Sequence, residues 1–142
     1  MKKILLFSIT AFTAFTTINN PAKDIVGIWK IDQSSIDEAA AAVINYTAKS
    51  KPEAAKQMEG QLASIKAFIR HTTFEYKADN TYNFDTPQGI LSGKWSFSAD
   101  NKYLIITRPA KPDRLDSVLE ITSTRLVLYN KERGDTSLFV HP

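Results

Sequence analysis

The chain has 142 residues, of which 43 % are hydrophobic, so it is long enough to bury one core and too apolar to be disordered. Basic residues number 18 and acidic residues 15; without Lys2 and Lys3 the basic residues number 16, so the rest of the chain is close to neutral. A near-neutral chain without a run of basic residues gives no support to a nucleic-acid partner. The absence of cysteine excludes disulfides, thiolate metal sites and a cysteine nucleophile.

Residues 1–20 have the pattern of a secretory signal peptide. The basic pair Lys2-Lys3 precedes an apolar run from Ile4 to Phe15, and small residues suited to cleavage follow. This run is shorter than the roughly 20 residues that a membrane span needs. We expect cleavage between Thr16 and Ala22, which leaves an exported domain over residues 21–142, periplasmic or secreted, without a membrane span. An uncleaved N-terminal anchor is the alternative.

Residues 25–31 form a β-rich run that predicts the first strand of the exported domain. Gly27 and Trp29 lie on one face of this strand. A glycine inside a strand indicates the close approach of a large side chain, either that of Trp29 or one from another strand.

The pattern then changes to a helical period. Ser35 and Glu38 fit a capping box, which predicts a helix over about 35–48. Pro52 is tolerated in the first turn of a second helix over about 52–69, although Gly60 lies inside it. Each predicted helix has one apolar face, so we expect a two-helix hairpin that covers another part of the molecule.

From His71 onward the pattern is that of short strands joined by short turns, which favours antiparallel pairing. Together with the first strand they make eight, the number at which a barrel interior is just filled or holds one small ligand. The sequence therefore predicts a mainly β fold: an eight-stranded antiparallel up-and-down barrel with a two-helix insertion between strands 1 and 2. Its later strands are expected near residues 72–77, 82–84, 91–98, 103–107, 115–121, 126–129 and 136–140.

Four segments carry a resemblance to a known superfamily. They are Gly27-Ile28-Trp29, the run from Phe74 to Phe84, the run from Gly93 to Phe97, and the run from Asn101 to Ile106. Over residues 24–141 the chain resembles the bacterial exported lipocalin-like domain families of the calycin and lipocalin superfamily, whose members mostly lack an assigned function.

The resemblance implies roles for two kinds of residue. In lipocalins a first-strand tryptophan closes one end of the barrel and a late-strand arginine packs across its ring. Trp29 would take the first role and Arg125 the second, with Arg133 as the alternative. The inserted helices depart from typical lipocalins, which place a helix near the C-terminus; fatty-acid-binding proteins carry a helical lid between their first two strands.

A set of aromatic residues is expected to point into the barrel, where it either fills the core or lines a partly open pocket. The first hypothesis is a protein that binds a small apolar or amphipathic ligand inside the barrel, gated by residues 35–69. The alternative is a protein-interaction or structural module of the cell envelope with a solid core. The tentative ligand-binding residues are Trp29, Phe74, Tyr76, Tyr82, Phe84, Trp95 and Phe97.

No catalytic motif, metal-ligand spacing or cofactor-binding loop is present, so we expect no enzyme activity, metal or cofactor. His71 is expected to be exposed at a strand entry and His141 to be frayed at the chain end. The acidic residues fall mostly in turns. An enzyme of unusual type is a third hypothesis, which two or more titratable groups facing into the barrel would support. The pattern gives no evidence for such a cluster, and which charges face inward is ambiguous, because a register shift of one residue moves every side chain to the other face.

Overall fold

The structure is a computed structural model that describes residues 20–142. The predicted signal peptide therefore lies, apart from Asn20, outside the described residues. Within the described part of the chain, no helix is both long enough and apolar enough to span a membrane.

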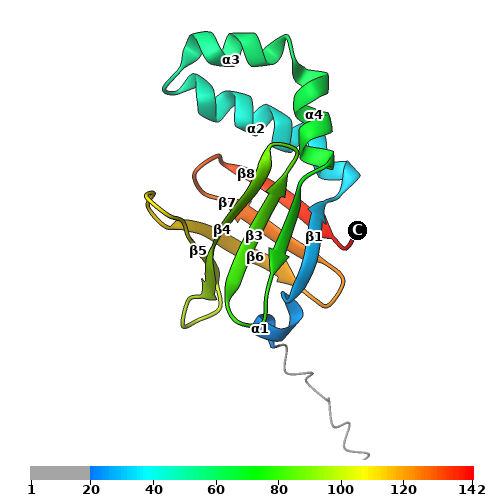
Figure 1. Cartoon of the computed structure of the whole chain (residues 1–142), viewed down its shortest axis with the longest axis vertical. Coiled ribbons are helices and arrows are strands. Elements are labelled where there is room, and N and C mark those ends of the chain that lie inside the picture. Colours follow the sequence, from blue (N-terminus) through cyan, green and yellow to red (C-terminus); the bar gives the residue numbers. More distant parts are fainter. Residues whose placement is uncertain (1–19) are drawn as a thin grey trace, which may run out of the picture.

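Eight antiparallel strands within residues 20–142 form one closed barrel in chain order, as the sequence predicts (Figure 1). Closure depends on the first strand, which pairs with the second strand through Gly27 to Trp29 and with the last strand through Lys30 and Ile31. The strands are β1 (Gly27–Ile31), β2 (Thr73–Tyr76), β3 (Thr81–Thr86), β4 (Gly89–Phe97), β5 (Tyr103–Thr107), β6 (Arg114–Ile121), β7 (Leu126–Asn130) and β8 (Asp135–Val140).

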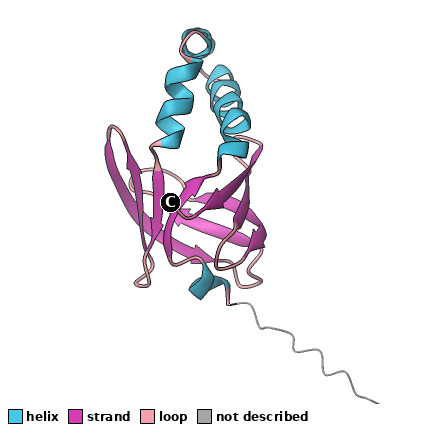
Figure 2. Cartoon of the chain, turned by 90° about the vertical axis from the view of Figure 1, so that its right-hand side faces the viewer, coloured by secondary structure: helices cyan, strands magenta, loops and turns pink. Residues whose placement is uncertain are grey.

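Helices lie at both ends of this barrel (Figure 2). The short helix α1 (Pro21–Asp24) lies at one end, just before β1. The insertion between β1 and β2 lies over the other end. It consists of the 3-10 turn η1 (Gln33–Ser35) and the helices α2 (Ile36–Ala48), α3 (Pro52–Glu59) and α4 (Leu62–Arg70).

The predicted second helix is broken into α3 and α4, so the insertion within the described residues has three helices rather than two. The break falls at Gly60 and Gln61, where Gln61 N–H donates to the Met58 carbonyl in a tight turn. Glycine is the weakest helix former after proline, and here its low propensity ends the helix. The break lets α4 turn back toward the barrel and bring Ile65 and Ile69 against the core.

The predicted capping box at the start of α2 is wrong. Ser35 occupies the N-cap position, but its hydroxyl accepts a hydrogen bond from the Leu138 N–H of β8 (2.9 Å) instead of capping α2. Glu38 likewise accepts from the Thr136 N–H of β8 (3.4 Å). Because β1 ends at Ile31, these β8 donors lie beyond its reach, and the insertion takes over their pairing.

At the α1 end, the Trp29 ring lies against the ring of His141, with centroids 4.0 Å apart. The His141 ring nitrogens also lie 2.7 Å from the Ile28 carbonyl oxygen and 2.9 Å from that of Ser123, so the expectation of a frayed residue is wrong. A Cβ on Gly27, whose φ is +143°, would lie 3.3 Å from the same ring. The close approach predicted at Gly27 is therefore that of His141.

The two arginines considered for the lipocalin-like contact have other partners. Arg125 is exposed and pairs with Glu120 of β6 (3.1 Å). Arg133 pairs with Asp135 (2.9 Å). Barrel closure brings the C-terminal histidine to Trp29, so it is His141, rather than Arg125 or Arg133, that packs on the indole.

Candidate functional site

The seven aromatic residues singled out in the sequence all belong to the interior cluster or pack against it, but they divide between two ends of the barrel. Toward the α1 end, Tyr76 packs on Tyr82 (5.2 Å between ring centroids) and on Trp95 (6.2 Å), which packs on Phe97 (5.9 Å). Trp29 is fully buried with them. These rings fill the barrel at this end.

Toward the helical insertion the interior is hollow. A cavity of about 170 Å³ lies between the insertion and the barrel. Of the seven aromatic residues, Phe74 and Phe84 line it, and Trp29, Tyr76, Tyr82, Trp95 and Phe97 do not. The remaining apolar lining comes from α2, α4 and three strands: Ala39, Val43, Ile65, Phe68, Ile69, Ile31, Leu128 and Phe139, with Thr72 between α4 and β2.

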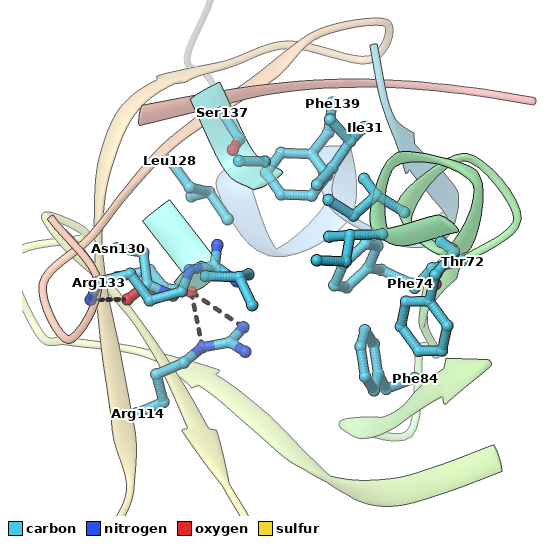
Figure 3. Close-up of a pocket in the computed structure, with 16 residues that line it drawn as sticks. Ile31, Thr72, Phe74, Phe84, Arg114, Leu128, Asn130, Arg133, Ser137 and Phe139 are labelled. Carbon is cyan, nitrogen blue, oxygen red and sulfur yellow. Dashed lines mark hydrogen bonds and ion pairs between the residues drawn. The ribbon is translucent and has the colours of Figure 1, made fainter. Parts of the chain in front are cut away.

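The opposite side of the cavity is a polar wall, which we define as Arg114, Asp116, Asn130, Arg133 and Ser137. Figure 3 shows Phe74 and Phe84 across the cavity from Arg114, Asn130 and Arg133. All five residues come from β6, β7, β8 and the turn between the last two. The cavity thus has an apolar side made by helices and aromatic rings and a polar side made by three neighbouring strands.

The inward direction of the polar residues on β6 follows from strand pairing. Arg114 lies opposite Ile106 and Asp116 opposite Leu104, both fully buried residues of β5. Directly paired residues share one face of a sheet, so the two charged side chains point inward and the intervening Leu115 points outward. The sequence reasoning missed this wall because apolar residues of a strand are expected to face inward. The register against β5 is the signal that could have found it.

Two arginine–aspartate pairs differ in how completely they are satisfied. Arg114 and Asp116 both belong to the polar wall, whereas Arg133 belongs to it and its partner Asp135 does not line the cavity. Arg133 reaches both carboxylate oxygens of Asp135, at 2.9 and 3.2 Å, and the Ser137 hydroxyl also donates to Asp135 (3.2 Å). Arg114 instead directs both its Nε and its Nη2 to the same oxygen, Oδ2 of Asp116, each at 3.0 Å.

The second carboxylate oxygen of Asp116 accepts no hydrogen bond from Arg114. Oδ1 is buried and has no hydrogen-bond partner among the described residues. The Asp116 side chain is only 3 % exposed, so bulk water does not solvate this oxygen well. A buried acceptor without a donor costs about 1–3 kcal/mol, and more when it carries charge. The wall therefore holds a buried acceptor that the chain itself does not satisfy.

The protonation states in this wall follow from burial and charge. Burial raises the pKa of Asp116 above its ordinary value, and the positive charge of Arg114 only partly opposes this. Burial alone would lower the pKa of Arg114, but the charge of Asp116 and the interactions with Tyr82 and Tyr76 together outweigh it and raise that pKa, so Arg114 stays charged. Burial also raises the pKa of Tyr82, whose hydroxyl interacts with Arg114 and stays neutral. The two arginines and two aspartates balance in charge.

This wall corrects one expectation from the sequence. Titratable groups do face into the barrel, so the feature that would favour an enzyme is present in Arg114 and Asp116. His71 is exposed at the end of α4, as expected. Within residues 20–142, no group of three or more histidine or acidic side chains is placed to hold a metal ion.

Comparisons with known proteins support the fold alone. No family model and no curated protein matches the chain. A crystal structure of a DUF4847 family protein from Bacteroides vulgatus is similar, with a TM-score of 0.51 and 16 % identity over 83 % of this chain and 94 % of that one. An NMR structure of a protein from Bacteroides uniformis has a TM-score of 0.43 and 19 % identity over 49 % of this chain and 72 % of that one. The likeness to the DUF4847 family protein supports the fold, and no lipocalin family is shown.

Proposed function

We propose that this chain is exported and that its barrel binds a small amphipathic molecule in the cavity beneath the helical insertion. The observation that carries the proposal is the two-sided lining of that cavity, with apolar helices and aromatic rings facing a polar wall. Ligand sites are concave and mostly apolar, with a few convergent polar groups that fix orientation. The predicted ligand-binding residues Phe74 and Phe84 supply aromatic surface on the apolar side.

The size of the cavity sets the scale of the ligand part that it encloses. A volume of about 170 Å³ is comparable to apolar cavities of roughly 150 Å³ that take up benzene. A single ring or a short alkyl segment with one polar end therefore fits without movement of the helices. A larger ligand would require α2 and α4 to move outward, since they form the cover over this end of the barrel (Figure 2).

Native mass spectrometry tests both parts of the proposal. The full chain would be produced in a bacterial host with a periplasm and purified without detergent. We expect a product that has lost about the first 20 residues and carries an extra mass that disappears on solvent extraction. A full-length product would contradict export, and an apo mass together with no binding in a panel of small aromatic alcohols, acids and aldehydes would contradict binding.

A pair of variants on α2 locates the binding. Val43 lines the cavity and Ala41 lies exposed on the same helix. We expect Val43→Phe to fill the cavity and abolish the extra mass, while Ala41→Phe leaves it in place. Equal retention of the ligand by both variants would place the ligand elsewhere.

The purified protein and the compound extracted from it also test two other functions. A cell-envelope module with a solid core predicts an interior without a cavity, which fits only the α1 end of this barrel. An enzyme is the other candidate, because the charged side chains of Arg114 and Asp116 face into the cavity and burial raises the pKa of Asp116. Returning the extracted compound to fresh protein separates binding from catalysis, since an enzyme would convert it and a binding protein would return it unchanged.

A further inference from the structure

We propose that the polar end of the ligand is a neutral hydrogen-bond donor, an alcohol hydroxyl or an amide N–H, which binds Oδ1 of Asp116. This inference rests on the proposed function, because it assigns chemistry to the polar wall of the same cavity. Two observations carry it. Within residues 20–142, Oδ1 of Asp116 is the one buried side-chain oxygen without a hydrogen-bond partner, and the neighbouring Arg114 donates to Oδ2 instead.

The first step is the unused acceptor of Asp116. Asp116 lines the cavity, and Arg114 saturates its Oδ2 from two nitrogens at 3.0 Å each. What the wall lacks at this point is a donor for Oδ1. A ligand hydroxyl or amide N–H supplies that donor, whereas an aldehyde, ether or carboxylate does not.

The second step concerns anions, which an arginine-lined cavity would otherwise attract. The charge of Arg114 is already neutralised by Asp116, and that of Arg133 by Asp135, which it holds through both oxygens. A ligand carboxylate placed against Arg114 would also lie close to the carboxylate of Asp116. Repulsion between like charges in a buried site disfavours that arrangement.

The third step is the contrast between the two aspartates. Asp135 accepts from Arg133 on both oxygens and from Ser137, so each of its oxygens has a donor. Asp135 is also absent from the cavity lining. The two pairs are alike in composition and differ in one free acceptor, which makes Asp135 a matched control for Asp116.

The test uses three probes of nearly equal size: benzyl alcohol, benzaldehyde and benzoate. Each would be titrated into the full chain, as processed by its host and labelled with nitrogen-15, and followed by NMR shifts of the residues that line the cavity. We expect benzyl alcohol to bind about 10- to 100-fold more tightly than benzaldehyde or benzoate, because only the alcohol donates to a charged acceptor.

A variant pair ties this preference to one atom. In Asp116→Asn the amide oxygen can still accept from Arg114, and the amide nitrogen then takes the place of Oδ1 and donates. We expect the preference for benzyl alcohol over benzaldehyde to fall at least about tenfold in Asp116→Asn. Asp135→Asn should keep the preference for benzyl alcohol over benzaldehyde.

The outcomes separate the inference from the proposed function. Equal affinities, or tightest binding of benzoate, would overturn the assignment of a donor ligand and leave binding in the cavity intact; a bound water that satisfies Oδ1 would give the equal result. An unchanged preference in Asp116→Asn would also overturn it. If no probe shifts a cavity residue at millimolar concentration, the proposed function falls and the inference with it. Should either variant fail to fold, the three-probe series on the unmodified protein still decides.

Discussion

The two ends of this barrel are built on the same eight strands and differ in whether their buried polar groups find partners inside the chain. At the α1 end, the indole N–H of Trp29 donates to the Ile25 carbonyl (2.7 Å) and that of Trp95 to the Lys77 carbonyl (2.9 Å). At the insertion end, Oδ1 of Asp116 is left without a donor beside a cavity. A fully satisfied end contributes stability, and the unsatisfied end is where a ligand can add something the chain lacks.

The largest expected effect comes from the filled end. Trp29→Ala should lower the free energy of unfolding by about 4 kcal/mol, because it removes a fully buried ring together with its hydrogen bond and its contact with His141. Phe84→Ala removes a half-buried ring that already borders a cavity, and we expect less than half of that loss. Urea unfolding followed by circular dichroism measures both; equal losses would mean that the two ends are packed alike.

A somewhat smaller loss is expected from opening the buried ion pair. Arg114→Met leaves Asp116 buried without its partner, which should cost about 3 kcal/mol in the free energy of unfolding. The double variant Arg114→Met, Asp116→Leu removes both charges and should recover most of the loss. If the double variant is as unstable as the single one, the pair stabilises the fold by itself, and its role is not limited to the cavity.

Local sequence patterns predicted the filled end well and the insertion end poorly. Alternation at Tyr76, Tyr82 and Trp95 marks inward faces because a strand repeats every two residues, and turn residues mark the strand ends. The same rule fails on β6, where Leu115 is apolar but exposed while its neighbours Arg114 and Asp116 point inward. Which side chains of β6 face inward is set by its pairing with β5, and a local sequence pattern carries no information about that pairing.

Other misses share this long-range origin. Ser35 has a good local reason to cap α2, yet it binds Leu138, which lies 103 residues further along the chain. His141 and the Ile28 carbonyl are 113 residues apart in sequence and meet only because β1 pairs with β8. The short pairing between β1 and β8 leaves two N–H groups of β8 without a strand partner. Ser35 and Glu38 accept hydrogen bonds from these groups, and His141 packs on the Trp29 indole.

The hydrogen bond between Ser35 and β8 attaches the insertion to the barrel, and its loss should have a smaller effect on stability. Ser35→Ala leaves the Leu138 N–H without its acceptor, and we expect a loss of about 1–2 kcal/mol in unfolding free energy. Amide hydrogen exchange should show faster exchange at Leu138 than in the unmodified protein. Ser64 is exposed on α4, so Ser64→Ala should change neither quantity. Unchanged exchange at Leu138 in Ser35→Ala would show that other contacts hold the insertion in place.

The smallest expected effect is a pH dependence of binding at the insertion end. Ligand donation to Oδ1 is strongest when Asp116 is ionised, so the affinity for benzyl alcohol should be highest above the pKa of Asp116 and fall as pH falls through it. Burial raises that pKa above 3.8, so the loss begins at a higher pH than an ordinary aspartate would give.

Three other aspartates should not produce this effect. Asp32, Asp79 and Asp100 have lowered pKa values, because the side chains of Ser34, Thr81 and Ser98 donate hydrogen bonds to them. They therefore stay ionised over the range in which Asp116 gains its proton. NMR titrations between about pH 7.5 and 4.5 should show a several-fold weaker affinity at the low end, and Asp116→Asn should show no trend. Tighter binding of benzyl alcohol at low pH would mean that the protonated carboxyl is the donor, and the polarity assigned to this wall would then be reversed.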